Sequence, residues 1–495
     1  MKTKKKLLAI LFFTLYFSVI TSNFLNAQNL LNYYNIKFHK LTNDNGLPDN
    51  NVTKIVQDSK GLIWLTTPNG FVRFDGIKTK VYQNKPNDST SLPNNLVRNV
   101  VIAQNDVFYI ATDIGLVKFY PQLERFEYMC TDKYPDLKNL NNAITGFTSI
   151  SNQRIVIEMN TIGFIIFDTK TDEVITIINN ENYGELGWPK INPTFQLEDK
   201  DGYLWFTSGE YGFYKIKIDG RKVQIKNYFG NINSKIEKTA NATIVYENDK
   251  GDIYFANNGL YILPYEKKET SEFRFIDIYN RKQPASNIDF NINDIIEDQK
   301  KNIWLATENY GVKKYNPKTN KIETISYKPC NFKGETSTTA RFWKDKQQQI
   351  WLMYKNSVFA RYNYSSNVFS EYKYDPTNPD SPFESFNFKN ISSSFQDKSG
   401  VYWLISNNYG LMFFDLKKAK FPILKDLHIP NYSISANTAW GIYEDTPHKR
   451  LWLGTNDASL NIIDLKTGRV TIDRTIQKVI FLSHLYFHFP KMSFG

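Results

Sequence analysis

The feature that most limits how this chain can fold is a unit of about 48 residues that recurs nine times. The spacings between successive unit centres run from 45 to 52 residues, and six of the nine tryptophans occupy this one position. The centres are Trp64, Tyr109, Val156, Trp205, Tyr254, Trp304, Trp351, Trp403 and Trp452. Such a repeat, built of short alternating runs, predicts β-propeller blades, because helical repeats would place apolar residues every three to four positions.

The first unit shows the anatomy that the others share. Residues 52–75 contain two alternating runs on either side of a mainly apolar run, and Asp58 and Gly61 precede the apolar run. Asp bonds nearby backbone N–H groups and Gly tolerates positive φ, so this D-x-x-G signal predicts a tight turn between strands. The alternation buries one side of each strand. Later alternating runs, at residues 79–82 and 368–374, are the expected fourth and outermost strands.

These features predict an all-β fold, with a seven-bladed β-propeller of four-stranded blades followed by an incomplete second propeller. We expect the first propeller to cover residues 34–364 and about two blades of the second to cover residues 365–474. Residues 34–42 form a lone alternating run, which we expect to be the outer strand beside residues 338–364 of the seventh unit. Such closure would remove the exposed edges of the terminal blade. Residues 475–495 lack blade alternation and form an aberrant tail.

Residues 1–27 have the three parts of a secretory signal peptide. A lysine-rich start precedes an apolar run at residues 7–20, and Leu25, Asn26 and Ala27 provide a cleavage site. We therefore expect an exported, periplasmic protein. An uncleaved anchor is the alternative, although the apolar run is shorter than the ~20 residues of a membrane-spanning helix.

The net charge of +11 overstates how basic the repeat body is. Four lysines lie in the signal segment, and residues 465–495 carry a further net charge of +4. No basic stripe runs through the repeats, so we expect no nucleic acid partner. We also expect no membrane span beyond the signal segment.

Few side chains are suited to catalysis or metal binding, and we predict no catalytic residue, no metal site and no cofactor. His484 and His488 have the i, i+4 spacing of a metal-ligand pair, but no third candidate ligand lies near them in the sequence. Asp58 and its equivalents are interpreted as turn residues, because a sialidase Asp box has one residue, not two, between Asp and Gly. Cys130 and Cys330 fall in different units, so we favour two unpaired thiols over a disulfide.

The candidate ligand-binding residues lie mainly in loops between the second and third strands of a unit. Amides, carboxylates and aromatic rings there could bind the hydroxyl groups and ring faces of a sugar. The candidates are Tyr211, Glu308, Asn309, Tyr310, Asn408, Tyr409 and Trp440. The three tyrosines each follow a repeat tryptophan by six residues, which leaves a structural role in blade packing open. Core packing is likewise the alternative for Trp440 and for the other off-repeat tryptophans, Trp188 and Trp343, while the repeat tryptophans are expected to pack between blades.

The run GLPDNNVTKIVQDSKGLIWLTTPNGFVRFDG at residues 46–76 resembles the two-component regulator propeller repeat. That repeat builds the periplasmic sensor region of hybrid two-component histidine kinases that control polysaccharide use. The resemblance implies an oligosaccharide from polysaccharide breakdown as the ligand and a homodimer formed through the propellers. In the family, two seven-bladed propellers precede a β-sandwich, a membrane helix and the kinase, and the ligand site depends on both propellers.

The chain departs from this family pattern because it stops in the ninth unit. The kinase and its phosphoacceptor histidine are missing, so we expect a truncated sensor that is not an enzyme. We expect it to bind an oligosaccharide weakly or not at all on its own. A split system, with the remaining blades and kinase on another chain, is the alternative explanation. Two other function classes stay open: a protein-interaction propeller without a small ligand, and a secreted propeller enzyme acting on polysaccharide.

Overall fold

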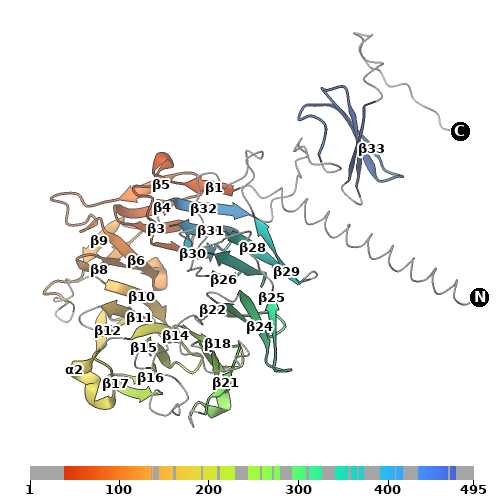
Figure 1. Cartoon of the computed structure of the whole chain (residues 1–495). Coiled ribbons are helices and arrows are strands. Elements are labelled where there is room, and N and C mark those ends of the chain that lie inside the picture. Colours follow the sequence, from red (N-terminus) through yellow and green to blue (C-terminus); the bar gives the residue numbers. More distant parts are fainter. Residues whose placement is uncertain are drawn as a thin grey trace, which may run out of the picture. The chain divides into compact units, whose positions relative to one another are not determined.

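The computed structural model describes residues 38–134, 137, 144–159, 163–190, 193–208, 212–228, 244–256, 259–269, 272–278, 292–307, 311–325, 340–354, 358–364, 367–372, 391–406, 408–415, 433–465 and 469–474. These residues form nine antiparallel four-stranded sheets (Figure 1). The helical segments among them are short: α2 (Asn180–Tyr183), η1 (Asn43–Asn45), η2 (Gln104–Asp106), η4 (Gly184–Leu186) and η5 (Tyr265–Lys267). The expected all-β fold of four-stranded blades is confirmed.

Eight of the nine sheets consist of four strands that follow one another in the chain, and seven of these come first in the sequence. The first three are β2 (Lys54–Gln57), β3 (Ile63–Thr67), β4 (Gly70–Phe74) and β5 (Thr79–Tyr82); β6 (Val97–Ile102), β7 (Phe108–Thr112), β8 (Gly115–Tyr120) and β9 (Arg125–Tyr128); and β10 (Ile144–Ile150), β11 (Arg154–Met159), β12 (Gly163–Asp168) and β13 (Glu173–Ile178). The fourth and fifth are β14 (Thr194–Glu198), β15 (Leu204–Ser208), β16 (Gly212–Asp219) and β17 (Lys222–Asn227); and β18 (Ile244–Glu247), β19 (Ile253–Ala256), β20 (Leu260–Leu263) and β21 (Arg274–Ile276). The sixth and seventh are β22 (Ile292–Glu297), β23 (Ile303–Thr307), β24 (Val312–Asn316) and β25 (Lys321–Ile325); and β26 (Ala340–Lys344), β27 (Ile350–Tyr354), β28 (Val358–Asn363) and β29 (Val368–Tyr372).

The eighth sheet combines the two ends of this series, and the ninth follows it in the chain. The eighth contains β30 (Ile391–Gln396), β31 (Val401–Ser406), β32 (Gly410–Asp415) and β1 (Phe38–Leu41). The ninth contains β33 (Ala439–Asp445), β34 (Arg450–Thr455), β35 (Leu460–Asp464) and β36 (Val470–Asp473). Contacts place the first eight sheets in a unit made of residues 39–374 and 382–414, and the ninth sheet in the other unit. The strands β30, β31 and β32, which the sequence assigned to a second propeller, therefore belong to the same unit as the first seven sheets.

The first strand of the chain completes the eighth sheet and not the seventh. β1 pairs with β32, so the sheet order is β1-β32-β31-β30. The prediction that residues 34–42 lie beside residues 338–364 is therefore wrong. The physical reason is that β29 already fills the outer position of the seventh sheet, where it pairs with β28 over its whole length. The unit consequently holds eight sheets where seven were expected.

Aromatic side chains fill the spaces between neighbouring sheets. Trp64 of the first sheet packs on Phe108 of the second, with ring centroids 4.9 Å apart. Comparable apolar clusters join each following pair of sheets up to the seventh. Between the seventh and eighth sheets, Trp351 contacts Tyr402 at 5.5 Å, and the Tyr402 hydroxyl donates a hydrogen bond of 2.9 Å to the Asp345 carboxylate.

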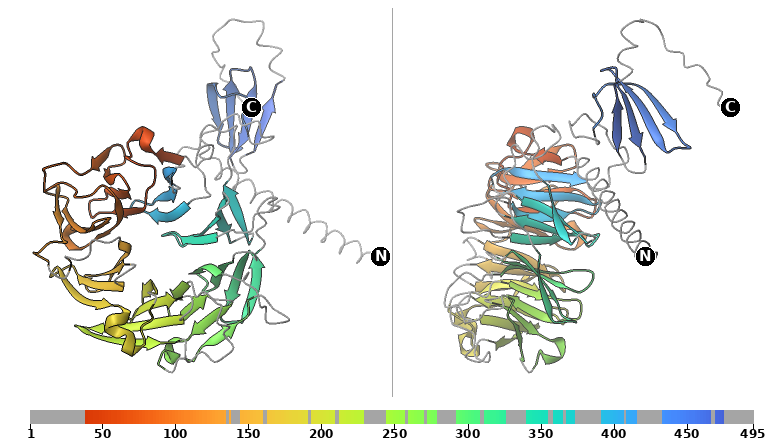
Figure 2. Two further views of the ribbon diagram at one scale, coloured as in Figure 1. Left: turned by 60° about the vertical axis from the view of Figure 1, so that its left-hand side comes forward. Right: turned by 45° about the vertical axis from the view of Figure 1, so that its right-hand side comes forward.

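The eighth sheet packs in turn on the first. Trp403 and Leu411 share one apolar cluster with Leu65 and Phe74. The eight sheets therefore close on themselves, as the progression of colours in the left view of Figure 2 shows. The repeat tryptophans of these sheets are at most 4% exposed, so the prediction that they pack between blades is confirmed. Burying ~150–250 Å² of aromatic surface stabilises the folded protein by about 4–6 kcal/mol per tryptophan.

The D-x-x-G turn is shaped by a hydrogen bond to the repeat tryptophan. Five sheets have a tryptophan indole N–H that donates at 2.9–3.0 Å to the aspartate six residues earlier. In the first sheet, the other carboxylate oxygen of Asp58 accepts the backbone N–H of Leu62 at 2.9 Å. The residue three after the aspartate has positive φ, +89° at Gly61, which explains the glycine. The prediction that this aspartate is a turn residue is confirmed.

The same turn also bonds several sheets to their neighbours. The backbone N–H of Lys200, directly after the turn aspartate of the fourth sheet, donates to the Glu247 carboxylate of the fifth at 2.9 Å. The backbone N–H of Lys398 donates in the same way to the side-chain oxygen of Gln57 at 2.7 Å, across 341 residues of sequence. The joint between the eighth and first sheets thus repeats a contact found inside the series.

Candidate functional site

The strand order gives each sheet of the eight-sheet unit two distinct ends. One end carries the turns between second and third strands and the links between sheets, and we call it the link end. The other carries the D-x-x-G turns and the turns between third and fourth strands, and we call it the turn end. The first strands of neighbouring sheets contact one another most, β6 with β10 and β22 with β26, so they are the innermost strands.

Two of the seven predicted ligand-binding residues lie at the link end. Asn408 and Tyr409 form the turn between β31 and β32 and are exposed, Tyr409 by 37%. Asn408 has a φ of +67°, and the N–H of the next residue, Gly410, donates to the Asn50 carbonyl oxygen at 2.8 Å. That bond anchors the turn to the segment leading into the first sheet. The two side chains can offer an amide and an aromatic ring to a ligand.

The other five predicted residues do not lie in the described part of the link end. Tyr211, Glu308, Asn309 and Tyr310 lie outside the described residues. Trp440 lies on β33 of the ninth sheet, in the other unit, and is 81% exposed, so it is not a core residue.

The two remaining off-repeat tryptophans pack inside the eight-sheet unit. Trp188 is 2% exposed and packs against Phe164 and Phe206. Trp343 is half-buried, with its ring 6.1 Å from that of Trp351. Trp188 is therefore a core residue, as the alternative interpretation of these tryptophans held, and Trp343 is partly buried in the core.

Several turns at the link end are held by repeated structural bonds. The hydroxyl groups of Thr67, Thr112 and Thr307 each donate to a backbone carbonyl three or four residues later, at 2.6–2.8 Å. In the second sheet, Arg98 and Asp113 form an ion pair of 2.6 Å, with both side chains more than 40% exposed. The link end therefore combines fixed turns with exposed polar and charged groups.

Two buried carboxyl groups, Asp294 on β22 and Glu158 on β11, bridge neighbouring sheets. Asp294 accepts the backbone N–H of Phe342 at 2.7 Å and that of Ile295 at 2.9 Å, and burial raises its pKa to about 6. Glu158 accepts the backbone N–H of Phe195 at 3.0 Å, and burial raises its pKa as well. They lie at different sheet interfaces, the sixth with the seventh and the third with the fourth. They therefore act as separate structural bridges and not as a paired acid and base.

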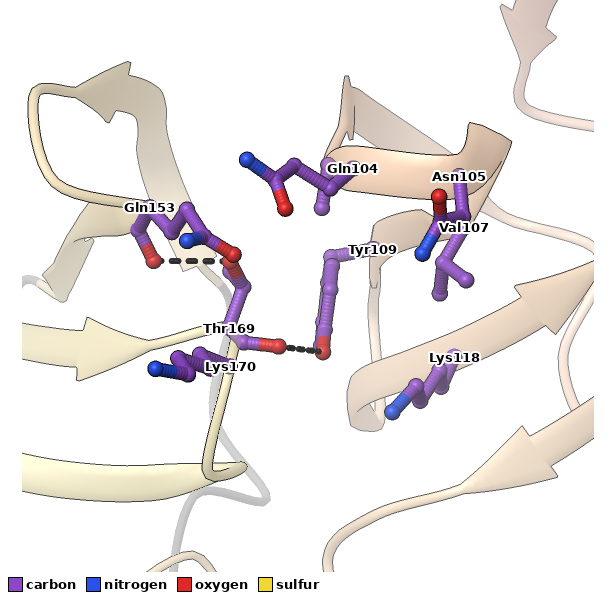
Figure 3. Close-up of a pocket in the computed structure, with 9 residues that line it drawn as sticks. Gln104, Asn105, Val107, Tyr109, Lys118, Gln153, Thr169 and Lys170 are labelled. Atoms are coloured by element: carbon purple, nitrogen blue, oxygen red, sulfur yellow. Dashed lines mark hydrogen bonds between the residues drawn. The ribbon is translucent and has the colours of Figure 1, made fainter.

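A polar cavity of about 240 Å³ lies at the turn end, between the second and third sheets (Figure 3). The lining residues are Ala103, Gln104, Asn105, Val107, Tyr109, Lys118, Gln153, Thr169 and Lys170. The Tyr109 hydroxyl lies 3.1 Å from the Thr169 carbonyl oxygen and also bonds the Asp172 carboxylate. The Lys118 ammonium group pairs with Asp172 at 2.5 Å.

The wall of this cavity carries a neutral hydroxyl group at Tyr109 and a positive charge at Lys118. Burial raises the pKa of the Tyr109 hydroxyl, and the bond to Asp172 adds to the shift, so the hydroxyl stays neutral. Burial alone would lower the pKa of Lys118, but the Asp172 contacts outweigh it and raise that pKa. Lys118 therefore carries a full positive charge at neutral pH, and its partner carboxylate is already engaged by two donors.

The sequence interpretation missed this cavity, although the signal was present. Ala103 occupies the position of the turn aspartate, six residues before Tyr109, which replaces the repeat tryptophan. The indole–carboxylate bond that fills this turn in five other sheets cannot form here. The cavity lies where that bond is missing.

The described residues also bear on the predictions about metal binding, the two cysteines and membrane spans. Among the described residues, no group of three or more His, Cys, Asp or Glu side chains could hold a metal ion, and His484 and His488 lie outside them. Cys130 is a buried free thiol, whereas Cys330 lies outside the described residues. None of the described helices has the length and apolar character to cross a membrane.

Residues 46–69 match the family model described as two component regulator propeller. This segment carries that repeat. The match covers β2 and β3 and the turn of Asp58, so the family signature coincides with the turn that joins strands and sheets. The resemblance read from the sequence is thereby confirmed.

The relatives of this propeller are partial matches. Histidine kinase P4 of Formosa agariphila is 40% identical over 76 residues, which are 15% of this chain and 6% of that protein. Two extracellular domains of hybrid two component systems from B. thetaiotaomicron match with 19% and 15% identity and TM-scores of 0.43 and 0.42. The alignments cover 88% and 87% of this chain, but only 60% and 58% of those domains. Virginiamycin B lyase from Staphylococcus aureus matches with 12% identity and a TM-score of 0.40, over 77% of this chain and 98% of the lyase.

Proposed function

We propose that this chain is the ligand-sensing propeller region of a hybrid two-component sensor and that it works outside the cytoplasm. The observation that carries the proposal is the regulator propeller repeat at residues 46–69. The 40% identity with part of a histidine kinase supports it. The proposed role of these residues is to sense the ligand, and a kinase would report its binding.

We propose further that the ligand is an oligosaccharide released from a polysaccharide. The support is the chemistry of the link end, where Asn408 offers an amide and Tyr409 an aromatic ring at an anchored turn. Planar amides bond pairs of sugar hydroxyls, and tyrosine rings pack on the C–H faces of sugars. The family resemblance implies a site that depends on both propellers, so we expect weak binding by this chain alone.

Thermal unfolding of the full chain with a panel of oligosaccharides tests this role. A ligand at ten times its Kd stabilises the folded chain by about 1.4 kcal/mol, so even millimolar affinity produces a measurable rise in Tm. Tyr409→Ala should abolish the rise. Tyr265→Ala is the matched control, because Tyr265 is 43% exposed but lies at the turn end, in η5.

Three outcomes separate the proposed role from its alternatives. A sugar-specific rise in Tm that is lost in Tyr409→Ala supports it. No rise with any oligosaccharide, together with capture of a specific protein, favours an interaction propeller. Release of products from a polysaccharide by the purified chain would show an enzyme and contradict the sensing role.

A further inference from the structure

The second sheet lacks a structural bond that five of the eight sheets share, and a cavity lies at that place. In five sheets the buried turn contains an indole N–H bonded to an aspartate six residues earlier. In the second sheet the same two positions are Ala103 and Tyr109. A methyl group replaces the carboxylate, and the smaller phenol points past it to the third sheet, where its hydroxyl donates to the Asp172 carboxylate and lies 3.1 Å from the Thr169 carbonyl oxygen. The unfilled volume is about 240 Å³.

The groups that face this volume are polar and mainly hydrogen-bond donors. Gln104 and Gln153 approach from the turns of the second and third sheets, as Figure 3 shows, with Tyr109 and Lys118 beneath them. Each amide can donate two hydrogen bonds and accept others. Lys118 adds a positive charge, and Lys170 adds a second cation at the rim. No carboxylate is among the lining residues, so the local balance favours a ligand that brings negative charge and hydroxyl groups.

The positive wall is held in place before any ligand arrives. The Lys118 ammonium group is fixed by Asp172 at 2.5 Å and lies 5.4 Å from the Tyr109 ring centroid and 5.5 Å from that of Tyr120. The Lys118 side chain is 11% exposed, so its field is only partly screened by water. The Thr169 main chain, which forms the opposite wall, is fixed by two bonds to the Gln153 carbonyl oxygen, at 2.7 and 2.8 Å. A ligand therefore meets ordered groups and loses little affinity to their ordering.

We propose that this cavity is a binding site for a small hydroxylated carboxylate of monosaccharide size, such as a free sugar acid. The carboxylate would approach Lys118, and the hydroxyl groups would bond the amides of Gln104 and Gln153. The volume supports this size, because pockets for drug-sized ligands begin at ~300 Å³. The site lies at the turn end, opposite the link end that carries Asn408 and Tyr409, so this inference does not depend on the proposed oligosaccharide site.

Isothermal titration calorimetry of the full chain tests the assignment with three probes. Glucuronate carries both the carboxylate and the hydroxyl groups, glucose carries the hydroxyl groups alone, and inorganic phosphate carries charge alone. We expect glucuronate to bind at least ~10-fold more tightly than either, because a hydrogen bond to a charged group is worth more than a neutral one. Equal binding of glucose or of phosphate would overturn the ligand class.

Two variants locate the site. Ala103→Asp combined with Tyr109→Trp restores the side chains of the other five sheets, fills the cavity and should abolish glucuronate binding. Gln104→Ala removes one amide and should weaken binding by about 3–10-fold. The matched control is Gln299→Ala, because Gln299 is an exposed glutamine at the same turn position of the sixth sheet.

The outcomes are decisive even if the double variant does not fold, since Gln104 is exposed and Gln104→Ala should melt like the parent chain. Loss of affinity in Gln104→Ala, with unchanged affinity in Gln299→Ala, supports the site. Unchanged glucuronate affinity in Gln104→Ala, or in a folded double variant, would place the ligand elsewhere and refute the proposal.

Discussion

Replacing Asp294 by Asn should remove a pH-dependent loss of stability that the structure builds into one sheet interface. The Asp294 carboxyl group lies between the innermost strands of the sixth and seventh sheets, where it accepts two backbone N–H groups. Burial raises its pKa from 3.8 to about 6, although the nearby Arg341 acts in the opposite direction. The folded protein therefore binds this proton more tightly than the unfolded chain does.

The sign and size of the effect follow from that difference. Because the folded-state pKa is the higher one, the stabilising contribution is fully present below pH 3.8 and is lost as the pH rises through about 6. A pKa difference of this size corresponds to about 3 kcal/mol of unfolding free energy. Asn cannot titrate, so the stability of Asp294→Asn relative to the parent should rise by about 2 kcal/mol between pH 4 and pH 6.5.

Urea unfolding followed by tryptophan fluorescence at several pH values measures this difference. Asn also offers one acceptor fewer to the two N–H groups, which adds a constant offset but no slope. Asp75→Asn is the control, because backbone N–H groups of Lys78 and Ile77 lower the pKa of that exposed carboxyl group. Its stability contribution is present above pH 3.8 and is lost as the pH falls, so the control should show the opposite slope. A flat difference for Asp294→Asn from pH 4 to 6.5 would refute the reasoning.

Three further perturbations test the joint, the turn and the buried thiol. Gly410→Ala should cost about 1–3 kcal/mol, because a Cβ there would lie 2.5 Å from the Leu41 carbonyl oxygen at a φ of +84°; Gly76→Ala shares positive φ in open space, so an equal loss there would contradict the steric argument. Asp58→Ala should cost about 2–4 kcal/mol in chemical unfolding, since a buried indole N–H and a backbone N–H both lose their acceptor. Burial raises the pKa of the Cys130 thiol, so it should react with an aromatic disulfide reagent far more slowly in the native chain than in urea, and equal rates would show that the thiol is accessible.

Much of the sheet architecture could be predicted because it follows from local sequence patterns. Period-two alternation and the D-x-x-G signal identify strands and turns from a few neighbouring residues, and Asp58 does in the structure what its spacing indicated. The partner of β1 could not be predicted in the same way. A four-residue strand, Phe38–Leu41, fits any open outer edge of a sheet. Its partner strand therefore depends on which edge the rest of the chain leaves unpaired. The run at residues 368–374 was itself the clue that the seventh sheet had no such edge.

The candidate sites divide along the same line. The position of Asn408 and Tyr409 at the link end could be predicted because turn residues between strands two and three share one end of every blade, and their part in ligand binding stays a prediction. The cavity beside Tyr109 was missed because it arises from two residues that are absent from their usual positions. A search for favourable side chains overlooks such a place, whereas a comparison of the repeats with one another finds it.

The pairing of β1 with β32 also has a consequence for how the protein assembles. At the joint between the eighth and first sheets, Lys398 bonds Gln57 across 341 residues, and the length-dependent entropy of closing such a loop in an unstructured chain is about 5 kcal/mol. If the intervening sheets stack one after another along the chain, they bring its ends together, so we expect the joint to be the last part of the unit to form. Until then, the edge of β32 accepts β1 from another copy as readily as its own. Crowded folding conditions should therefore yield domain-swapped dimers that contain only native hydrogen bonds.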